Sequence, residues 1–174
     1  RINYSGFTYQ DSLGSEEITN GDFSNGLTNW TNYGITSASN GVATIGANAN
    51  SGIYQGVLIQ NKSYKVTINV TSYNGVGQAQ VADDTGFVLY TINAVGKHTF
   101  TFEHTITNLN LIIRGLSNAL FSIDNVSVKE YLGQEVVPDS GCGSWLFESQ
   151  STNLITQSEL FSDASWLKAG ASVT

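Results

Sequence analysis

Aromatic side chains between residues 33 and 90 carry the most distinctive chemistry. Aromatic rings stack on the apolar faces of sugars, and neighbouring amides and carboxylates bind the sugar hydroxyls. The pattern therefore predicts carbohydrate binding, although the residues form no recognisable cluster in the sequence. The alternative is that at least half of these rings pack in a core or an interface. The candidate aromatic residues are Tyr33, Tyr54, Tyr73, Phe87 and Tyr90, and the nearby amides are Asn32, Gln55, Asn74 and Gln80.

Histidines and an acidic run are the other residues that could bind a ligand or a metal. The run Asp83-Asp84-Thr85-Gly86 lacks the alternating ligands and the distal Glu of an EF-hand, so it predicts a polar β-turn. His98 and His104 are spaced evenly along one predicted strand, on the same side as Phe100 and Phe102. No third His or nearby Cys completes a metal triad. We expect both histidines to pack against an adjacent sheet or chain.

Catalytic motifs are absent from the sequence. It contains no Gly-x-Ser-x-Gly, His-Glu-x-x-His, P-loop or dinucleotide-binding pattern. A glycosidase needs a pair of carboxylates, but nothing in the sequence singles out two of the candidates. We therefore interpret the chain as non-enzymatic. The candidate carboxylates are Asp22, Asp83, Asp84, Glu103 and Asp124.

Composition narrows the fold class and the partners. Thr, Asn, Ser, Gly and Val dominate, which is typical of an all-β domain with many turns. The net charge of −7 and the lack of a Lys/Arg cluster argue against nucleic-acid binding. No apolar run approaches the roughly 20 residues that span a bilayer, so we expect no membrane insertion. The single Cys142 excludes an internal disulfide and a Cys-based zinc site.

Short strands separated by turn residues make up residues 17–131. Tyr64, Val66, Ile68 and Val70 alternate with polar residues, which predicts a strand with one buried face. About nine strands of this kind predict an antiparallel two-sheet β-sandwich of the jelly-roll type. The dipeptide Asn40-Gly41 predicts a hairpin, and residues 11–15 predict a turn. The predicted strands are residues 35–39, 42–45, 53–59, 63–73, 78–82, 87–92, 96–105, 109–116 and 120–128.

A repeated segment indicates that the chain is modular. Residues 18–30, here called the opening segment, carry Phe23 and Trp30, and an altered copy occupies residues 155–166. The features that survive in both copies are packing anchors, so we interpret the segment as the start of a sandwich module. Because the chain begins at Arg1 and stops soon after the second copy begins, we expect it to be a fragment of a longer protein. The predicted domains are an N-terminal extension or edge strand (1–16), the sandwich (17–131), a linker (132–153) and the irregular start of a second, truncated module (154–174).

Three motifs give residues 17–130 a family resemblance. They are Ile18-Thr19-Asn20-Gly21-Asp22-Phe23-Ser24, Gln60-Asn61-Lys62-Ser63-Tyr64 and Phe121-Ser122-Ile123-Asp124-Asn125-Val126. In this order the chain resembles the carbohydrate-binding modules of the galactose-binding-like, jelly-roll superfamily. Such modules often hold a structural Ca²⁺, so the resemblance implies a calcium site at Gly21, Asp22 and Asp124. Ser24 replaces the Glu that is common in the family and removes one charged ligand.

A second resemblance covers residues 144–166. The run from Leu146 to Ile155, followed by Ser158-Glu159-Leu160-Phe161-Ser162, resembles a junction in the tail and fibre proteins of bacteriophages. The resemblance implies a non-enzymatic virion protein, a homo-oligomer that is often trimeric, whose sandwich serves assembly with other virion proteins and binding to cell-surface glycans. The alternative is a carbohydrate-binding module of a secreted bacterial glycan-degrading enzyme. A third hypothesis is an inert spacer.

Overall fold

The computed structural model describes residues 7–138, and the side chains of residues 10–134. These residues form eleven strands and no helix, and all the strand pairs are antiparallel. The all-β prediction is therefore confirmed. In chain order the strands are β1 (Phe7–Glu16), β2 (Thr31–Tyr33), β3 (Thr36–Ser39), β4 (Val42–Ile45), β5 (Asn50–Gly56), β6 (Lys62–Tyr73), β7 (Gln78–Ala82), β8 (Val88–Ile92), β9 (Gly96–His104), β10 (Asn110–Leu116) and β11 (Phe121–Pro138).

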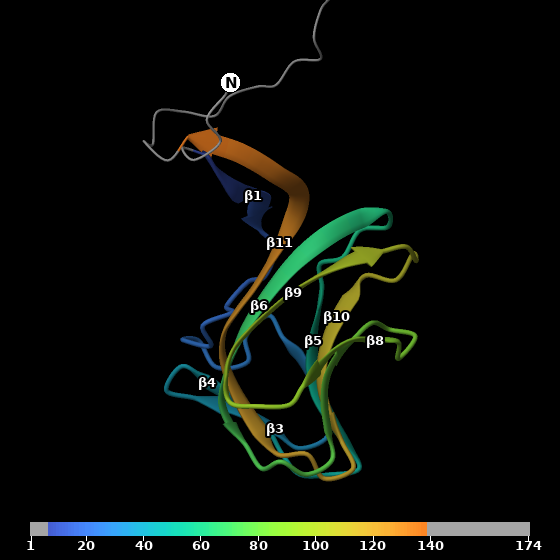
Figure 1. Ribbon diagram of the computed structural model, residues 1–174. Helices are drawn as coiled ribbons and strands as arrows, with labels where there is room; N and C mark the ends of the chain where they lie inside the picture. The colour runs from blue at the N-terminus through green and yellow to red at the C-terminus, as the bar shows by residue number, and fades with distance from the viewer. Residues whose placement is uncertain (1–6, 139–174) are drawn as a thin grey trace, which may run out of the picture.

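The strands make two sheets that pack face to face (Figure 1). The six-stranded sheet has the order β3-β4-β11-β6-β9, with β1 also paired to β11. The five-stranded sheet has the order β2-β5-β10-β7-β8. This arrangement is the jelly-roll β-sandwich that the strand spacing predicts.

The core lies between the sheets and follows the alternation of the sequence. Tyr64, Val66, Ile68 and Val70 of β6 are all buried, as predicted. The five-stranded sheet meets them with buried apolar residues of its own, including Ile53, Val81 and Ile113. Each such side chain contributes about 1.5–3 kcal/mol when it is fully removed from water.

The opening segment is an irregular loop built on two buried rings. Phe23 and Trp30 lie in the core with ring centroids 5.5 Å apart, which confirms that they are packing residues. The indole Nε1 of Trp30 donates to the carbonyl oxygen of Asn20 at 3.0 Å. In the Asn20-Gly21 dipeptide the positive φ is at Asn20, with a value of 55°, and not at Gly21. Gly21 is needed because a Cβ there would lie 2.0 Å from the carbonyl oxygen of Val126 in β11.

The strand β2 was not predicted, and β5 lies at a position different from the predicted one. The sequence did not indicate β2, whose three residues are too few to show an alternating pattern. The strand expected at residues 53–59 instead spans Asn50–Gly56, because small residues at its start pair with β10. The hairpin predicted at Asn40-Gly41 is confirmed, with φ of 52° and 77° at the two turn residues.

The strand β11 continues through residues 132–138, which were assigned to the linker. It pairs there with β1, and the two extend beyond the sandwich as a ribbon (Figure 1). The turn expected at residues 11–15 is part of β1, where the register with β11 shifts on either side of Leu13. The rest of the predicted linker and the second module lie outside the described residues.

Candidate functional site

The register of the five-stranded sheet places aromatic and polar side chains together on the side away from the core. Arg114 of β10 lies opposite both Gly52 of β5 and Gln80 of β7, and Tyr33 of β2 also lies opposite Gly52. In the next row Tyr54 lies opposite Ile112. Directly opposed residues point to the same side of a sheet. We call this side, defined by Tyr33, Tyr54, Gln80, Ile112 and Arg114, the outer face.

Two of the predicted tyrosines form a pair on the outer face. The rings of Tyr33 and Tyr54 are half-buried, with centroids 6.5 Å apart and an interplanar angle of 45°. Burial raises the pKa of Tyr33, while the nearby Arg114 guanidinium lowers it and Tyr54 adds a smaller upward shift. The two rings therefore give the face an apolar surface close to a fixed positive charge.

A glycine allows the Tyr33 ring to lie against the sheet. A Cβ built at Gly52 would come within 2.6 Å of the Tyr33 hydroxyl oxygen and 2.8 Å of its Cζ atom. Real Cβ atoms essentially never approach so closely, so any other residue at position 52 would displace the ring. The ring is consequently positioned by the backbone of its neighbouring strand.

Arg114 is held by neutral acceptors. Its Nε and Nη2 atoms donate to Gln80 Oε1 at 3.3 Å and 3.2 Å, and Nη2 also donates to the carbonyl oxygen of Gly86 at 2.9 Å. The amide of Gln80 in turn donates to Gln78 Oε1 at 3.2 Å. Within residues 10–134 the ion pairs are Lys62–Glu130 and Lys65–Asp11, so no described carboxylate neutralises Arg114. The guanidinium is oriented but keeps its charge and its Nη1 donors for a ligand.

This arrangement has groups that can bind hydroxyl-rich molecules. Tyrosine rings suit the apolar face of a sugar, and a fixed guanidinium with amides suits its hydroxyl or carboxylate oxygens. The outer face has no paired carboxylates and no nucleophile next to a base, which hydrolysis would require.

The structure separates the other two predicted tyrosines from this pair. Tyr73 ends β6 in the opposite sheet and packs against the core. Tyr90 stacks on Phe100 with centroids 4.4 Å apart, and its hydroxyl lies 3.0 Å from His98 Nδ1. Of the nearby amides, Gln80 lies on the outer face, whereas Gln55 turns inward and its side chain bonds to the backbone of Thr19. The predicted inward packing of the histidines is confirmed, because His98 and His104 are both buried.

Sequence reasoning missed Arg114 and Gly52. Arg114 lies in a strand whose alternate residues Leu111 and Ile113 are buried. A charged residue at the positions between them is expected on the side of the strand that faces solvent, and this pattern could have identified Arg114. Gly52 carried no signal beyond lying in a run of small residues. Its role depends on which strand lies beside it.

The predicted calcium residues lie near the contact between the opening segment and β11. The carbonyl oxygen of Gly21 accepts from Val126 N at 2.9 Å. Asp22 Oδ1 accepts from the backbone and hydroxyl of Ser24, which lowers the pKa of Asp22. Both carboxylate oxygens of Asp124 accept from Asn125 at 2.6 Å. Calcium takes six to eight oxygen ligands, so backbone carbonyls and waters would have to complete the shell, and the site stays a prediction.

Across the described residues, no group of three or more His, Cys, Asp and Glu side chains is arranged to hold a metal ion. None of these residues forms a helix with the length and hydropathy needed to cross a bilayer. No protein-family model and no curated protein matches the chain.

Several solved structures resemble the chain at low identity. The mannan binding module from Man5C matches with a TM-score of 0.46 at 15% identity, over 62% of this chain and 96% of that one. The CBM22-1–GH10 modules of Clostridium thermocellum xylanase Xyn10B, complexed with xylohexaose, match with a TM-score of 0.45 at 17% identity, over 70% and 29% of the two chains. The CBM22-1 xylan-binding domain of Paenibacillus barcinonensis Xyn10C matches with a TM-score of 0.42 at 11% identity, over 68% and 96%. At these values the ligand of this chain has to be argued from its own residues.

Proposed function

We propose that the chain is a non-catalytic glycan-binding module whose outer face contacts a polysaccharide. The observation that supports this most directly is the Tyr33–Tyr54 pair beside the fixed guanidinium of Arg114. Three adjacent strands, β2, β5 and β10, supply these groups. An extended sugar chain crossing the strands would meet rings and hydrogen-bonding groups in succession.

Attachment to a secreted glycan-degrading enzyme fits this function best. A binding surface without catalytic groups is useful when it holds a partner domain close to an insoluble or polymeric substrate. A virion fibre or tail adhesin would use the same outer face to bind a host surface. The junction at residues 144–166 that motivates the virion hypothesis, with its oligomeric state, lies outside the described residues and stays a prediction.

Affinity electrophoresis tests the proposal. The chain is run in native gels that contain xylan, mannan, mixed-linkage β-glucan or polygalacturonate, and its retardation is compared with that in an empty gel. We expect retardation by at least one polymer. Removing one ring through Tyr54→Ala should weaken that binding by about tenfold, which corresponds to about 1.4 kcal/mol.

Tyr131→Ala is the matched control, because Tyr131 is half-buried on β11 in the other sheet. It should keep the retardation of the wild type. Equal retardation of the wild type and a Tyr33→Ala/Tyr54→Ala double variant would show that the outer face does not bind the polysaccharide. Free migration of the wild type in every gel would argue against glycan binding by this face.

A further inference from the structure

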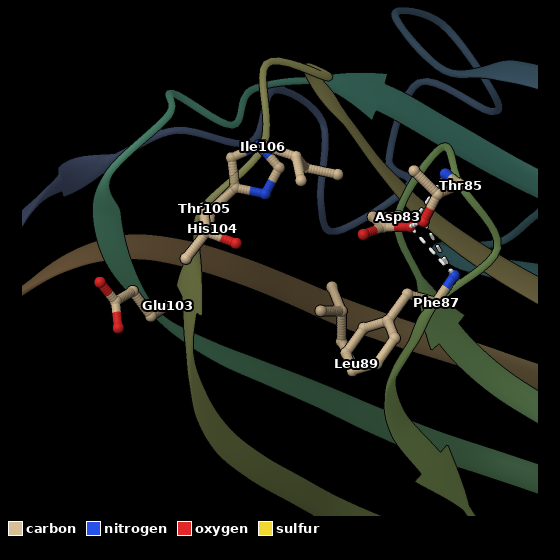
Figure 2. A pocket seen from close by; sticks show the side chains of 8 residues that line it. All are labelled: Asp83, Thr85, Phe87, Leu89, Glu103, His104, Thr105 and Ile106. Atoms are coloured by element: carbon tan, nitrogen blue, oxygen red, sulfur yellow. Dashed lines mark hydrogen bonds between the residues drawn. The ribbon is translucent and has the colours of Figure 1, made fainter.

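A second candidate site lies at one end of the sandwich, between two loops. The loop from β7 to β8 and the end of β9 with the loop that follows it enclose a pocket of about 260 Å³ (Figure 2). It shares no residue with the outer face. The residues that line it are Asp83, Thr85, Phe87, Leu89, Glu103, His104, Thr105 and Ile106.

Asp83 fixes one wall of this pocket and keeps one oxygen for a ligand. The side chain is only 5% exposed, and its Oδ1 accepts from Thr85 N at 2.9 Å, Thr85 Oγ1 at 2.6 Å and Phe87 N at 3.0 Å. These bonds hold the turn in one shape. Figure 2 shows the second carboxylate oxygen directed towards the side of the pocket where His104 lies. Among the described residues this Oδ2 atom has no hydrogen-bond partner. Every buried side-chain nitrogen or oxygen atom of these residues does have a partner, so Oδ2 is not buried and opens onto the pocket.

His104 supplies a second acceptor from the opposite wall. The ring is 2% exposed, and its Nε2 lies 2.5 Å from the carbonyl oxygen of Asn108. A carbonyl can only accept, so Nε2 carries the hydrogen and Nδ1 of the neutral ring is an acceptor. In the part of the chain that the structure describes, Nδ1 has no partner, and by the same reasoning it opens onto the pocket. Two acceptors on nearly buried residues therefore face one cavity.

Phe87 provides an apolar surface next to these acceptors. Its side chain is 68% exposed, although the turn held by Asp83 fixes its backbone. Figure 2 shows the ring beside Leu89, below the space between Asp83 and His104. A large apolar side chain presented to solvent on a rigid turn is a common feature of binding sites.

We propose that this pocket binds a single sugar ring, such as the end of a glycan chain. Two neighbouring hydroxyls of the ring donate to Asp83 Oδ2 and His104 Nδ1, and its C–H face packs on Phe87. The volume lies below the range of about 300–1,000 Å³ for drug-sized ligands, which suits one ring better than an oligosaccharide. The pocket would thus recognise a sugar ring by a mode different from that of the outer face.

Backbone amide spectra test this assignment. The ¹⁵N-labelled chain is titrated, in buffer containing EDTA, with D-galactose, D-mannose, D-glucose and D-xylose in turn. With at least one sugar we expect saturable shifts concentrated at residues 83–89 and 103–106. Phe87→Ala should weaken this binding by about tenfold, and Phe87→Trp should restore it. Because Phe87 is exposed, neither variant should disturb folding, and a thermal melt checks this.

A second variant and a control separate the pocket from the outer face. His104→Phe keeps a ring of similar size but removes the acceptor, so the shifts should be lost while Phe87→Trp retains them. Tyr54→Ala should leave the monosaccharide shifts unchanged even though it weakens polysaccharide retardation. The assignment is overturned if no sugar shifts these amides, if Phe87→Ala binds as tightly as the wild type, or if binding requires a divalent ion in place of EDTA.

Discussion

The ring of Tyr33 lies over the backbone of Gly52, on the strand next to its own. The glycine has no Cβ, and one placed there would come within 2.6 Å of the Tyr33 hydroxyl oxygen. Gly52 lies opposite Tyr33 in β2 and opposite Arg114 in β10. The missing side chain of Gly52 thus lets the Tyr33 ring lie on the same side of the sheet as Arg114.

Gly52→Ala is expected to displace Tyr33 and weaken polysaccharide binding by about tenfold or more. It should also destabilise the fold, because the new Cβ would lie 2.8 Å from the carbonyl oxygen of Ile113. Gly56→Ala is the control on the same strand, since its Cβ would meet the end of the Asn110 side chain at 3.3 Å. Gel retardation and urea unfolding measure both effects, and unchanged retardation for Gly52→Ala would contradict the role given to this glycine.

Arg114→Lys should weaken glycan binding although it keeps the positive charge. The three N–H donors of lysine radiate from one atom, so bonds to Gln80 and Gly86 would leave a single donor, whereas Arg114 makes both contacts with Nε and Nη2 and keeps its Nη1 donors for a ligand. We expect a loss of about 1.5–3 kcal/mol in binding free energy, the usual value for hydrogen bonds to charged groups. Isothermal titration with the best polysaccharide measures it, and Lys97→Gln on the opposite sheet should have no effect. An Arg114→Lys variant that binds like the wild type would show that charge alone matters.

Tyr90→Phe should lower the free energy of unfolding by about 1–3 kcal/mol and leave glycan binding unchanged. His98 Nε2 donates to the carbonyl oxygen of Ala94, so Nδ1 accepts from the Tyr90 hydroxyl. The substitution leaves that buried nitrogen without a donor while the stacking on Phe100 is kept. Urea denaturation measures the difference, with Tyr131→Phe as the control. A loss of glycan binding in a folded Tyr90→Phe protein would show that Tyr90 belongs to the binding site.

Acid should weaken the attachment of β1 through Asp11. The hydrogen bond from Lys65, followed by that from Gln134, lowers the pKa of Asp11 in the folded state. A carboxyl whose folded pKa is depressed contributes stability above its unfolded pKa of about 3.9 and loses it as the pH falls through the folded value. Melting temperatures of the wild type and Asp11→Asn should therefore differ at pH 7 and converge as the pH falls through the depressed folded pKa of Asp11. A constant difference across this range would exclude the ion pair, and the exposed Glu103→Gln serves as the control.

Calcium, if it binds at Gly21, Asp22 and Asp124 as proposed, should stabilise the chain. A ligand at 100 times its dissociation constant adds about 2.7 kcal/mol to the free energy of unfolding. The melting temperature should then rise with millimolar CaCl₂ and return to its original value with excess EDTA, and Asp124→Asn should remove the rise. Identical melting in CaCl₂ and EDTA would show that these residues serve only the loop contacts seen in the structure.

Local patterns predicted a large part of the fold. The alternation through Tyr64, Val66, Ile68 and Val70 identified the buried face of β6, and Asn40-Gly41 identified a hairpin. Both features depend on neighbours close in sequence. The three-residue strand β2 and the pairing of β1 with residues 132–138 escaped prediction because each depends on a distant partner strand.

By itself, the sequence determined the fold class, the inward-facing residues of β6 and β9 and a set of aromatic residues suited to sugars. A side-chain period of two is enough for this, because it separates the two sides of each strand. Only the tertiary structure decided which residues work together. Tyr33 and Tyr54 form a pair, and Tyr90 packs against the core, because the order and register of strands far apart in sequence set which side chains are neighbours. The same long-range pairing brought Arg114 and Gly52 to the outer face and set Asp83 across a pocket from His104.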